Sequence, residues 1–349
     1  MSSAPPIKVR CQGVWKVFGP QPEQVVAELE AGASKSEVLS QSGHVLAVRD
    51  ISFEVRAGET FIVMGLSGSG KSTLLRCLPR LIAPTRGQVF IDGEDIAQLD
   101  DNALRQVRRH KVSMVFQNFG LFPHRRIIDN VAYGLEIQGI KKSERYAKAK
   151  AVIEQVNLKG WEQHYPGQLS GGMQQRVGLA RALAVDPEIM LFDEPFSALD
   201  PLIRREMQDE LIKLQQQLHK TIIFITHDFA EAIKLAGAAK GRIAIMKDGE
   251  FVQVGSSEEL ILKPVNGYVA EFTRDVPRTS VLTARSIMQP IQPGLTQHPI
   301  AATLKLDALL ALLADTDAKL PVVDEGGSVV GSLDRRTVML ALSRDGAAL

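Results

Sequence analysis

The sequence contains few cysteines and few aromatic residues, and its charges almost cancel. The only cysteines, Cys11 and Cys77, are too few for a disulfide framework or a cysteine-rich metal site, and they fit a reducing compartment. Aromatic residues make up 5% of the 349 residues, and the formal net charge is +1. Chains that bind nucleic acid typically carry a strong positive charge or basic runs interleaved with aromatics. We therefore predict no nucleic-acid partner.

The sequence also lacks a hydrophobic run long enough to span a membrane, which requires about 18 residues. The longest candidate, Ala308–Ala314, is far shorter. The first residues, Met1–Pro6, show neither the basic nor the apolar region of a signal peptide. We predict a cytoplasmic protein that works at a membrane only by docking to another subunit.

Short, largely apolar runs of strand length alternate with helical patterns along the chain. Three such runs are Thr60–Met64, Ile189–Phe192 and Thr221–Thr226. This alternation is typical of an α/β fold with a largely parallel sheet that is buried on both faces.

The length of 349 residues exceeds that of one ordinary domain. A change to Pro-, Thr- and Ser-containing sequence predicts a linker at residues 276–284, between a domain at residues 1–275 and a smaller unit at residues 285–349. Within the first domain, the patterns predict a helical insertion at residues 20–43 and a helical subdomain at about 118–180.

A glycine-rich loop connects the run Thr60–Met64 to a predicted helix. Its GxxxxGK[ST] pattern lets successive backbone N–H groups point at phosphate oxygens, while Lys71 supplies a positive charge and the Ser72 hydroxyl suits Mg²⁺. A turn without a ligand is the alternative, but the strand–loop–helix context favours a nucleoside triphosphate. Pro79 is expected to kink this helix or to end it early. The predicted phosphate-binding residues are Gly65, Leu66, Ser67, Gly68, Ser69, Gly70, Lys71, Ser72 and Thr73.

Two adjacent carboxylates, Asp193 and Glu194, end the apolar run Ile189–Phe192. The carboxyl ends of parallel strands face the ligand crevice, and neighbouring strand positions point to opposite faces. Asp193 is therefore predicted to bind Mg²⁺ through a water molecule, and Glu194 is predicted to orient and polarise the attacking water. Adjacent acids at a turn are more often only solvated charges, but the upstream phosphate loop argues against that reading.

A glutamine and a histidine also follow predicted strands. Gln117 is neutral and long enough to reach both Mg²⁺ and the attacking water, and His227 follows the run Thr221–Thr226. Taken alone, Gln117 is ambiguous and a histidine at a strand end is more often structural. Their order among the other motifs favours a catalytic role for both.

The segment Leu169–Arg176 reads LSGGMQQR. With the phosphate loop, Gln117, the Asp193–Glu194 pair, the Ser197–Asp200 loop and His227, it resembles the ATP-hydrolysing subunit of ABC transporters. The resemblance covers roughly residues 7–272. It implies a P-loop NTPase of the ABC type, in which a mixed sheet core is joined by antiparallel β and α-helical subdomains.

The resemblance further implies that two copies of the chain enclose two ATP molecules head to tail, with Mg²⁺. Asp200 of one copy would then contact the opposite site, and His227 would hold the γ-phosphate. Phe18 matches the aromatic that lies under the adenine. From each copy, the signature residues that would reach the other copy's ATP are Ser170, Gly171 and Gly172.

The family places such a subunit at the cytoplasmic face of the membrane, bound to integral membrane permease subunits. An extracytoplasmic substrate-binding protein would be an indirect partner. The chain is most similar to importer ATPases for quaternary amines, through the insertion at residues 20–43, the segment Arg80–Gly87 and the segment Phe196–Leu211. The expected cargo is choline or glycine betaine, and the short tail favours the choline branch.

The tail resembles a single CBS repeat, through Leu320–Gly331 and a predicted helix at residues 337–341. Nucleotide-binding CBS repeats typically carry Thr-x-x-Asp, whereas this chain reads Asp334 to Thr337 at the corresponding positions. The missing aspartate argues against nucleotide sensing by the tail. A dimerisation or docking role and an ionic-strength sensor both stay open.

Other functions are compatible with parts of the sequence. The chain could serve an amino-acid or sugar importer, although sugar importers usually carry a larger β-barrel tail. A non-transport ABC ATPase would carry two cassettes or a long coiled coil, and this chain has one phosphate loop and no sustained heptads. A nucleotide sensor without catalysis would not need Glu194, His227 and Gln117.

Overall fold

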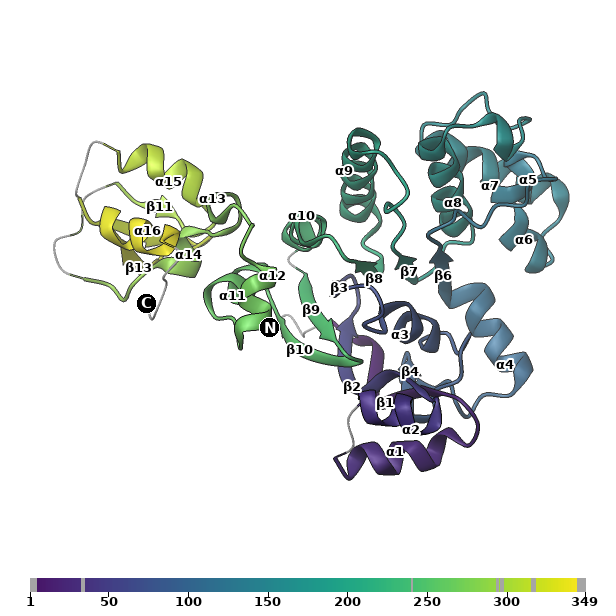
Figure 1. Cartoon of the computed structure of the whole chain (residues 1–349). Coiled ribbons are helices and arrows are strands. Elements are labelled where there is room, and N and C mark those ends of the chain that lie inside the picture. The colour runs from purple at the N-terminus through teal and green to yellow at the C-terminus, as the bar shows by residue number, and fades with distance from the viewer. Residues whose placement is uncertain are drawn as a thin grey trace. The chain divides into compact units, whose positions relative to one another are not determined.

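The computed structural model describes residues 5–32, 35–239, 241–292, 295, 298–314 and 318–343. The chain divides into two compact units, Met1–Val252 and Gln253–Leu349, which are described separately below (Figure 1). The linker predicted at residues 276–284 lies within the second unit. The assignment of residues 253–275 to the nucleotide-binding domain stays a prediction.

A largely parallel sheet forms the centre of the first unit. Its six strands lie in the order β10-β9-β3-β8-β7-β6. Parallel pairing joins β3 to β8 and β9, β8 to β7, and β7 to β6, which confirms the predicted architecture. All residues of β3, β7 and β8 are buried, which explains why these strands read as continuous apolar runs. The strands are β3 (Thr60–Met64), β6 (Val112–Val115), β7 (Ile189–Asp193), β8 (Thr221–Thr226), β9 (Arg242–Lys247) and β10 (Glu250–Gly255).

A second, antiparallel sheet completes the β structure of this unit, in the order β2-β1-β4-β5. Its tightest turn is at Asp92 and Gly93, whose φ angles of 52° and 78° suit a two-residue hairpin. The strands are β1 (Ile7–Phe18), β2 (Val45–Arg56), β4 (Arg86–Ile91) and β5 (Glu94–Asp95). Its side chains continue into the hydrophobic core of the central sheet.

The predicted helical insertion is present between β1 and β2. It consists of α1 (Pro22–Glu30) and α2 (Lys35–Ser42). The helices cover β1 and β2 through a separate small core, to which α1 contributes Val25, Val26 and Leu29 from one face and α2 contributes Val38. That core consists of Trp15, Val17, Val25, Val26, Leu29, Val38 and Leu46.

Helices form the region between β6 and β7, as predicted, and Figure 1 shows α5 to α8 in one group. The helices here are α5 (Ile127–Val131), α6 (Tyr133–Ile137), α7 (Lys142–Gln155) and α8 (Gly171–Ala184), with a short 3₁₀ helix at Pro166–Gln168. Before β6 lie α4 (Asp101–Gln106) and a π-helical turn at Val107–Lys111.

The remaining helices of the first unit follow strands of the central sheet. They are α3 (Lys71–Cys77), α9 (Pro201–Leu218) and α10 (Phe229–Ala239). Helix α3 ends shortly before Pro79, which confirms the predicted early stop. In the described part of the chain, no helix has both the length and the hydrophobicity that crossing a membrane requires.

The second unit contains a small sheet in the order β11-β12-β13, with β11 parallel and β13 antiparallel to β12. The helix predicted at residues 337–341 is confirmed as part of α16. The strands are β11 (Ile300–Ala301), β12 (Leu320–Val323) and β13 (Val329–Leu333). The helices are α11 (Ser257–Leu262), α12 (Gly267–Phe272), α13 (Arg278–Val281), α14 (Ala284–Ile287), α15 (Leu306–Leu312) and α16 (Arg335–Leu342).

Candidate active site

The glycine-rich loop lies between β3 and α3, and two of its glycines have no room for a side chain. A Cβ on Gly65 would lie 2.2 Å from the Met246 carbonyl oxygen, and one on Gly70 would lie 1.9 Å from that of Ala47. Gly70 also has a φ of 104°, which disfavours other residues. Neighbouring strands therefore enforce glycine here, and the loop keeps a compact cradle of backbone N–H groups.

Lys71 is the cation of this cradle, and it is only 4% exposed. Its Nζ donates to the carbonyl oxygens of Gly65, at 2.9 Å, and Leu66, at 3.1 Å. It also lies 3.4 Å from Glu194 Oε1. A buried ammonium needs such partners. Phosphate oxygens would provide a stronger partner than neutral carbonyls do.

Asp193 ends β7 with 2% exposure, and both of its oxygens accept hydrogen bonds. Ser72 Oγ donates to Oδ1 at 2.6 Å, and Arg76 Nη2 donates to Oδ2 at 3.0 Å. The structure thus brings together Ser72 and Asp193, two of the three residues that the sequence predicts around Mg²⁺, whereas Gln117, which the structure also describes, has no hydrogen bond to either of them. Arg76 was missed by sequence reasoning, although its position one turn after Ser72 on the same helix was a usable signal.

Glu194 connects Lys71 with His227. Its Oε2 lies 2.8 Å from His227 Nδ1, while Oε1 faces Lys71 Nζ. The backbone of Glu194 has a φ of 45°, and its N–H donates to the Ile225 carbonyl at the end of β8. A positive φ is unfavourable for glutamate, and its presence beside the loop indicates that the fold imposes this side-chain direction. Three of the predicted residues therefore meet at the carboxyl ends of β7 and β8.

Gln117 follows β6 and is exposed. Among the described residues, no hydrogen bond joins its side chain to Asp193 or Glu194. Arg181 of α8 holds the backbone just beyond it, by donating to the Phe119 carbonyl at 3.0 Å and the Gly120 carbonyl at 2.6 Å. Burial lowers the pKa of the Arg181 guanidinium. This contact between the Gln117 loop and α8 was also missed, because the sequence does not show which helix packs there.

The signature residues form the beginning of α8. The Ser170 side chain caps the helix by accepting from Met173 N at 3.4 Å, and Ser170 and Gly171 are exposed. A Cβ on Gly172 would lie 2.5 Å from Ile203 Cγ2, so α8 packs closely on the start of α9. Asp200 caps α9 by accepting from Ile203 N at 3.2 Å. These residues are thus held rigidly, with Ser170, Gly171 and Asp200 turned toward solvent.

Phe18 is the last residue of β1, and it is 40% exposed. The Nζ of Lys16 lies 5.0 Å from the centre of its ring. An exposed ring with a neighbouring cation is suited to stacking against a base that carries phosphates.

The comparisons with known proteins agree with this geometry. A family model described as "ABC transporter" matches residues 48–197. The glycine betaine transport ATP-binding protein OpuAA of Bacillus subtilis (strain 168) is 54% identical over 284 residues, which is 81% of this chain and 67% of that protein. The glycine betaine/proline betaine transport system ATP-binding protein ProV of Escherichia coli (strain K12) is 47% identical over 339 residues, which is 97% of this chain and 83% of that protein.

A solved structure is also similar. It is the dimeric structure of a post-hydrolysis state of the ATP-binding cassette MJ0796 bound to ADP and Pi, with a TM-score of 0.59 and 33% sequence identity. The similarity covers 71% of this chain and 98% of that one.

Proposed function

The chain belongs to the family of ABC transporter ATP-binding proteins, and from this premise we propose that it powers the import of glycine betaine or a related quaternary amine. It is an ATP hydrolase of the P-loop type. The proposed hydrolysis mechanism is supported by the position of the Glu194 carboxylate between Lys71 and His227.

The ATP phosphates bind the loop from Gly65 to Thr73 in this proposal. Backbone N–H groups and Lys71 supply the positive field, and Gly65 and Gly70 lie too close to neighbouring carbonyls to carry side chains that would cover those N–H groups. Ser72 and Asp193 fit Mg²⁺, since both offer hard oxygen atoms and already lie within 2.6 Å of one another. Bound Mg²⁺ would neutralise phosphate charge, and Gln117, in the loop after β6, would supply a further oxygen to the ion.

Glu194 is the proposed general base or its electrostatic equivalent. Its carboxylate is held from two sides, by Lys71 and by His227, so its oxygens have fixed directions. Once phosphate oxygens attract Lys71, the Glu194 carboxylate is left to polarise water. His227 is half exposed beside it and can contact the γ-phosphate while it orients that carboxylate.

The second site component comes from another copy of the chain. Ser170, Gly171 and Asp200 are exposed at capped helix starts, and among the described residues no hydrogen bond joins their side chains to their own phosphate loop. We propose that they and Gly172 complete the ATP site of a head-to-tail partner. The γ-phosphate then joins the two copies, and its hydrolysis loosens their interface.

The cargo is proposed from the relatives, because the amine would never touch this chain. Quaternary ammonium groups are held by aromatic cages, which would belong to the extracytoplasmic binding protein. Both relatives named above carry glycine betaine in their names, and neither name contains choline. We therefore propose glycine betaine as the cargo in place of the choline preference drawn from the short tail. Permease subunits would connect the chain to the membrane.

The tail is proposed as a CBS-like dimerisation unit. Its element order β11-α15-β12-β13-α16 supports the proposal of a single repeat. Asp334 begins α16 as a cap, accepting from the backbone N–H and the hydroxyl of Thr337. Its carboxylate is thereby used within the helix, which supports a structural role over nucleotide sensing. An ionic-strength sensor is the competing role.

The test is the ATPase activity of the complete permease complex. Binding protein would be added empty or loaded with glycine betaine, proline betaine or choline, at low and high salt. We expect the highest stimulation with glycine betaine. Equal activity with every ligand and with none would refute the quaternary-amine assignment, and a salt response that requires residues 285–349 would support the sensor role instead of dimerisation alone.

A further inference from the structure

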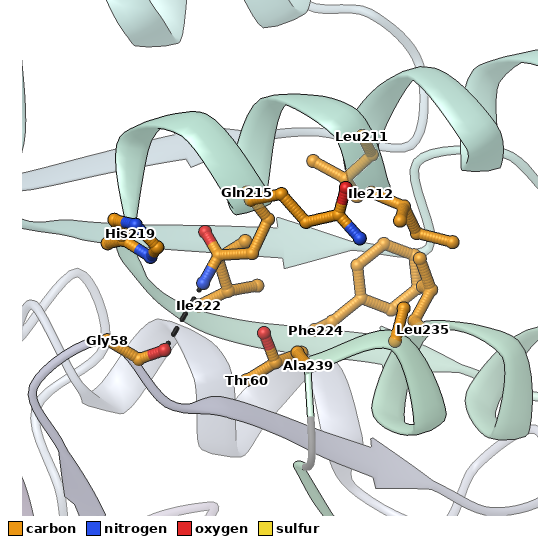
Figure 2. Close-up of a pocket in the computed structure, with 12 residues that line it drawn as sticks. Gly58, Thr60, Leu211, Ile212, Gln215, His219, Ile222, Phe224, Leu235 and Ala239 are labelled. Atoms are coloured by element: carbon orange, nitrogen blue, oxygen red, sulfur yellow. Dashed lines mark hydrogen bonds between the residues drawn. The ribbon is translucent and has the colours of Figure 1, made fainter.

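A cavity of about 290 Å³ lies in the first unit, away from the nucleotide residues. It is bounded by the start of β3, by β8, and by the facing sides of α9 and α10 (Figure 2). The phosphate loop follows the other end of β3, His227 follows the other end of β8, and Asp200 caps the other end of α9. The cavity is therefore separate from the ATP site.

The walls of this cavity are mainly apolar. The apolar residues that line it include Leu211, Ile212, Ile222, Phe224, Leu235, Ala238 and Ala239. No aspartate, glutamate, lysine or arginine is among the lining residues that the structure describes. Apart from His219 at the open side, the described lining residues offer a charged ligand no ionic partner for its lost hydration, so the inner part of the cavity favours a neutral molecule.

Thr60 places an unpartnered hydroxyl at this cavity. Its side chain is 4% exposed, and Oγ1 is buried without a hydrogen-bond partner. Figure 2 shows this oxygen pointing into the space below α9. A buried hydroxyl without a partner is costly, and a ligand that hydrogen-bonds to it would remove that cost.

Gln215 provides a second unpartnered atom. Its Nε2 donates to the carbonyls of Lys220, at 2.6 Å, and Gly58, at 3.3 Å, which fixes the orientation of the amide. Its Oε1 is buried and has no partner. An amide oxygen only accepts hydrogen bonds, so a matching ligand needs an O–H or N–H donor.

The open side of the cavity carries polar residues. Gln216 and His219 also line it, and both are exposed. His219 ends α9 in the left-handed conformation with a φ of 49°. Entry from solvent past these side chains needs no unfolding of the core.

From these observations we propose that this cavity binds a small neutral molecule with an apolar body and one hydroxyl group. The hydroxyl accepts from the Thr60 hydroxyl and donates to Gln215 Oε1, and the apolar body packs against Ile212 and Ala239, two apolar lining residues that are not fully buried. The volume is at the lower end of the range for small-molecule sites, which fits a molecule of one or two rings.

The matched probes are 2-naphthol, which has the hydroxyl, and naphthalene, which lacks it. Binding is followed by ligand fluorescence on the full chain, with ATP absent. We expect saturable binding of 2-naphthol, and we expect Thr60→Val to weaken it by about threefold to tenfold, as loss of one neutral hydrogen bond does. Naphthalene binding should stay unchanged in Thr60→Val, which serves as the control for an intact cavity.

A blocking variant provides the second test. Ala239→Trp adds an indole to a residue that lines the cavity, and it should abolish binding of both probes while the thermal transition stays cooperative. The proposal is overturned if 2-naphthol does not saturate, if Thr60→Val affects both probes equally, or if binding survives in Ala239→Trp.

Discussion

Replacing Glu194 by Gln tests the assignment of the catalytic base. The substitution keeps the size of the side chain and its ability to accept from His227, whose Nδ1 lies 2.8 Å from Glu194 Oε2. It removes the negative charge that faces Lys71 at 3.4 Å and the ability to polarise water. General-base catalysis contributes roughly 10²–10⁴-fold to rates, so hydrolysis should fall by that factor.

ATP affinity should not fall in Glu194→Gln, because removing a carboxylate beside the phosphates reduces repulsion. The assay is single-turnover hydrolysis of ATP, with nucleotide binding and dimer formation measured on the same sample by fluorescence and size-exclusion chromatography. The variant should accumulate as an ATP-bound dimer. Glu188→Gln, at an exposed glutamate that pairs with Lys8, is the matched control and should hydrolyse ATP normally. Hydrolysis by Glu194→Gln within tenfold of the unmodified chain would refute Glu194 as the base.

Three further substitutions test the structural account. Gly70→Ala should destabilise the chain by about 3 kcal/mol or more in chemical denaturation, because its Cβ would meet the Ala47 carbonyl at 1.9 Å and its φ is positive; a wild-type midpoint would contradict the steric argument. Asn130→Ala should lower the free energy of unfolding by about 3 kcal/mol, since this fully buried amide forms hydrogen bonds with four backbone groups of the loop before α5. A decrease below about 1 kcal/mol would show that water replaces those hydrogen bonds. Asp334→Ala should cost about 1 kcal/mol at pH 7 through the lost cap. The hydrogen bond from the Thr337 backbone N–H lowers the pKa of Asp334 below its ordinary value of 3.8. The stability difference between the unmodified chain and Asp334→Ala should therefore be complete above pH 3.8 and should vanish as the pH falls through the lowered pKa. A stability difference that grows on acidification would contradict this prediction.

The phosphate site could be predicted from the sequence because its parts are local. The strand, the glycines and the helix start all lie in one continuous segment, and the steric contacts at Gly65 and Gly70 explain the pattern physically. The meeting of Asp193 with Ser72, and of Glu194 with His227, followed from the rule that parallel strands end at one edge.

The partners of that site could not be predicted in the same way. Arg76 bonds Asp193, and Arg181 bonds the carbonyls of Phe119 and Gly120, across separations that no local pattern encodes. The cavity beside Thr60 depends on how α9 and α10 pack on β3 and β8, which is a tertiary property. The linker at residues 276–284 stays a prediction, and it lies within the second unit, which begins at Gln253. Helices α11 and α12 contribute to the second unit through packing, whereas composition changes only after them.

The central claim is that ATP hydrolysis at Glu194 drives uptake of a quaternary amine through a permease. The most direct measurement is uptake of labelled glycine betaine into proteoliposomes that contain the permease and this chain, with ATP and Mg²⁺ on the side of this chain and binding protein on the other. We expect ATP-dependent accumulation that is lost in Glu194→Gln and kept in Glu188→Gln. Accumulation without ATP, or equal uptake in Glu194→Gln, would contradict it.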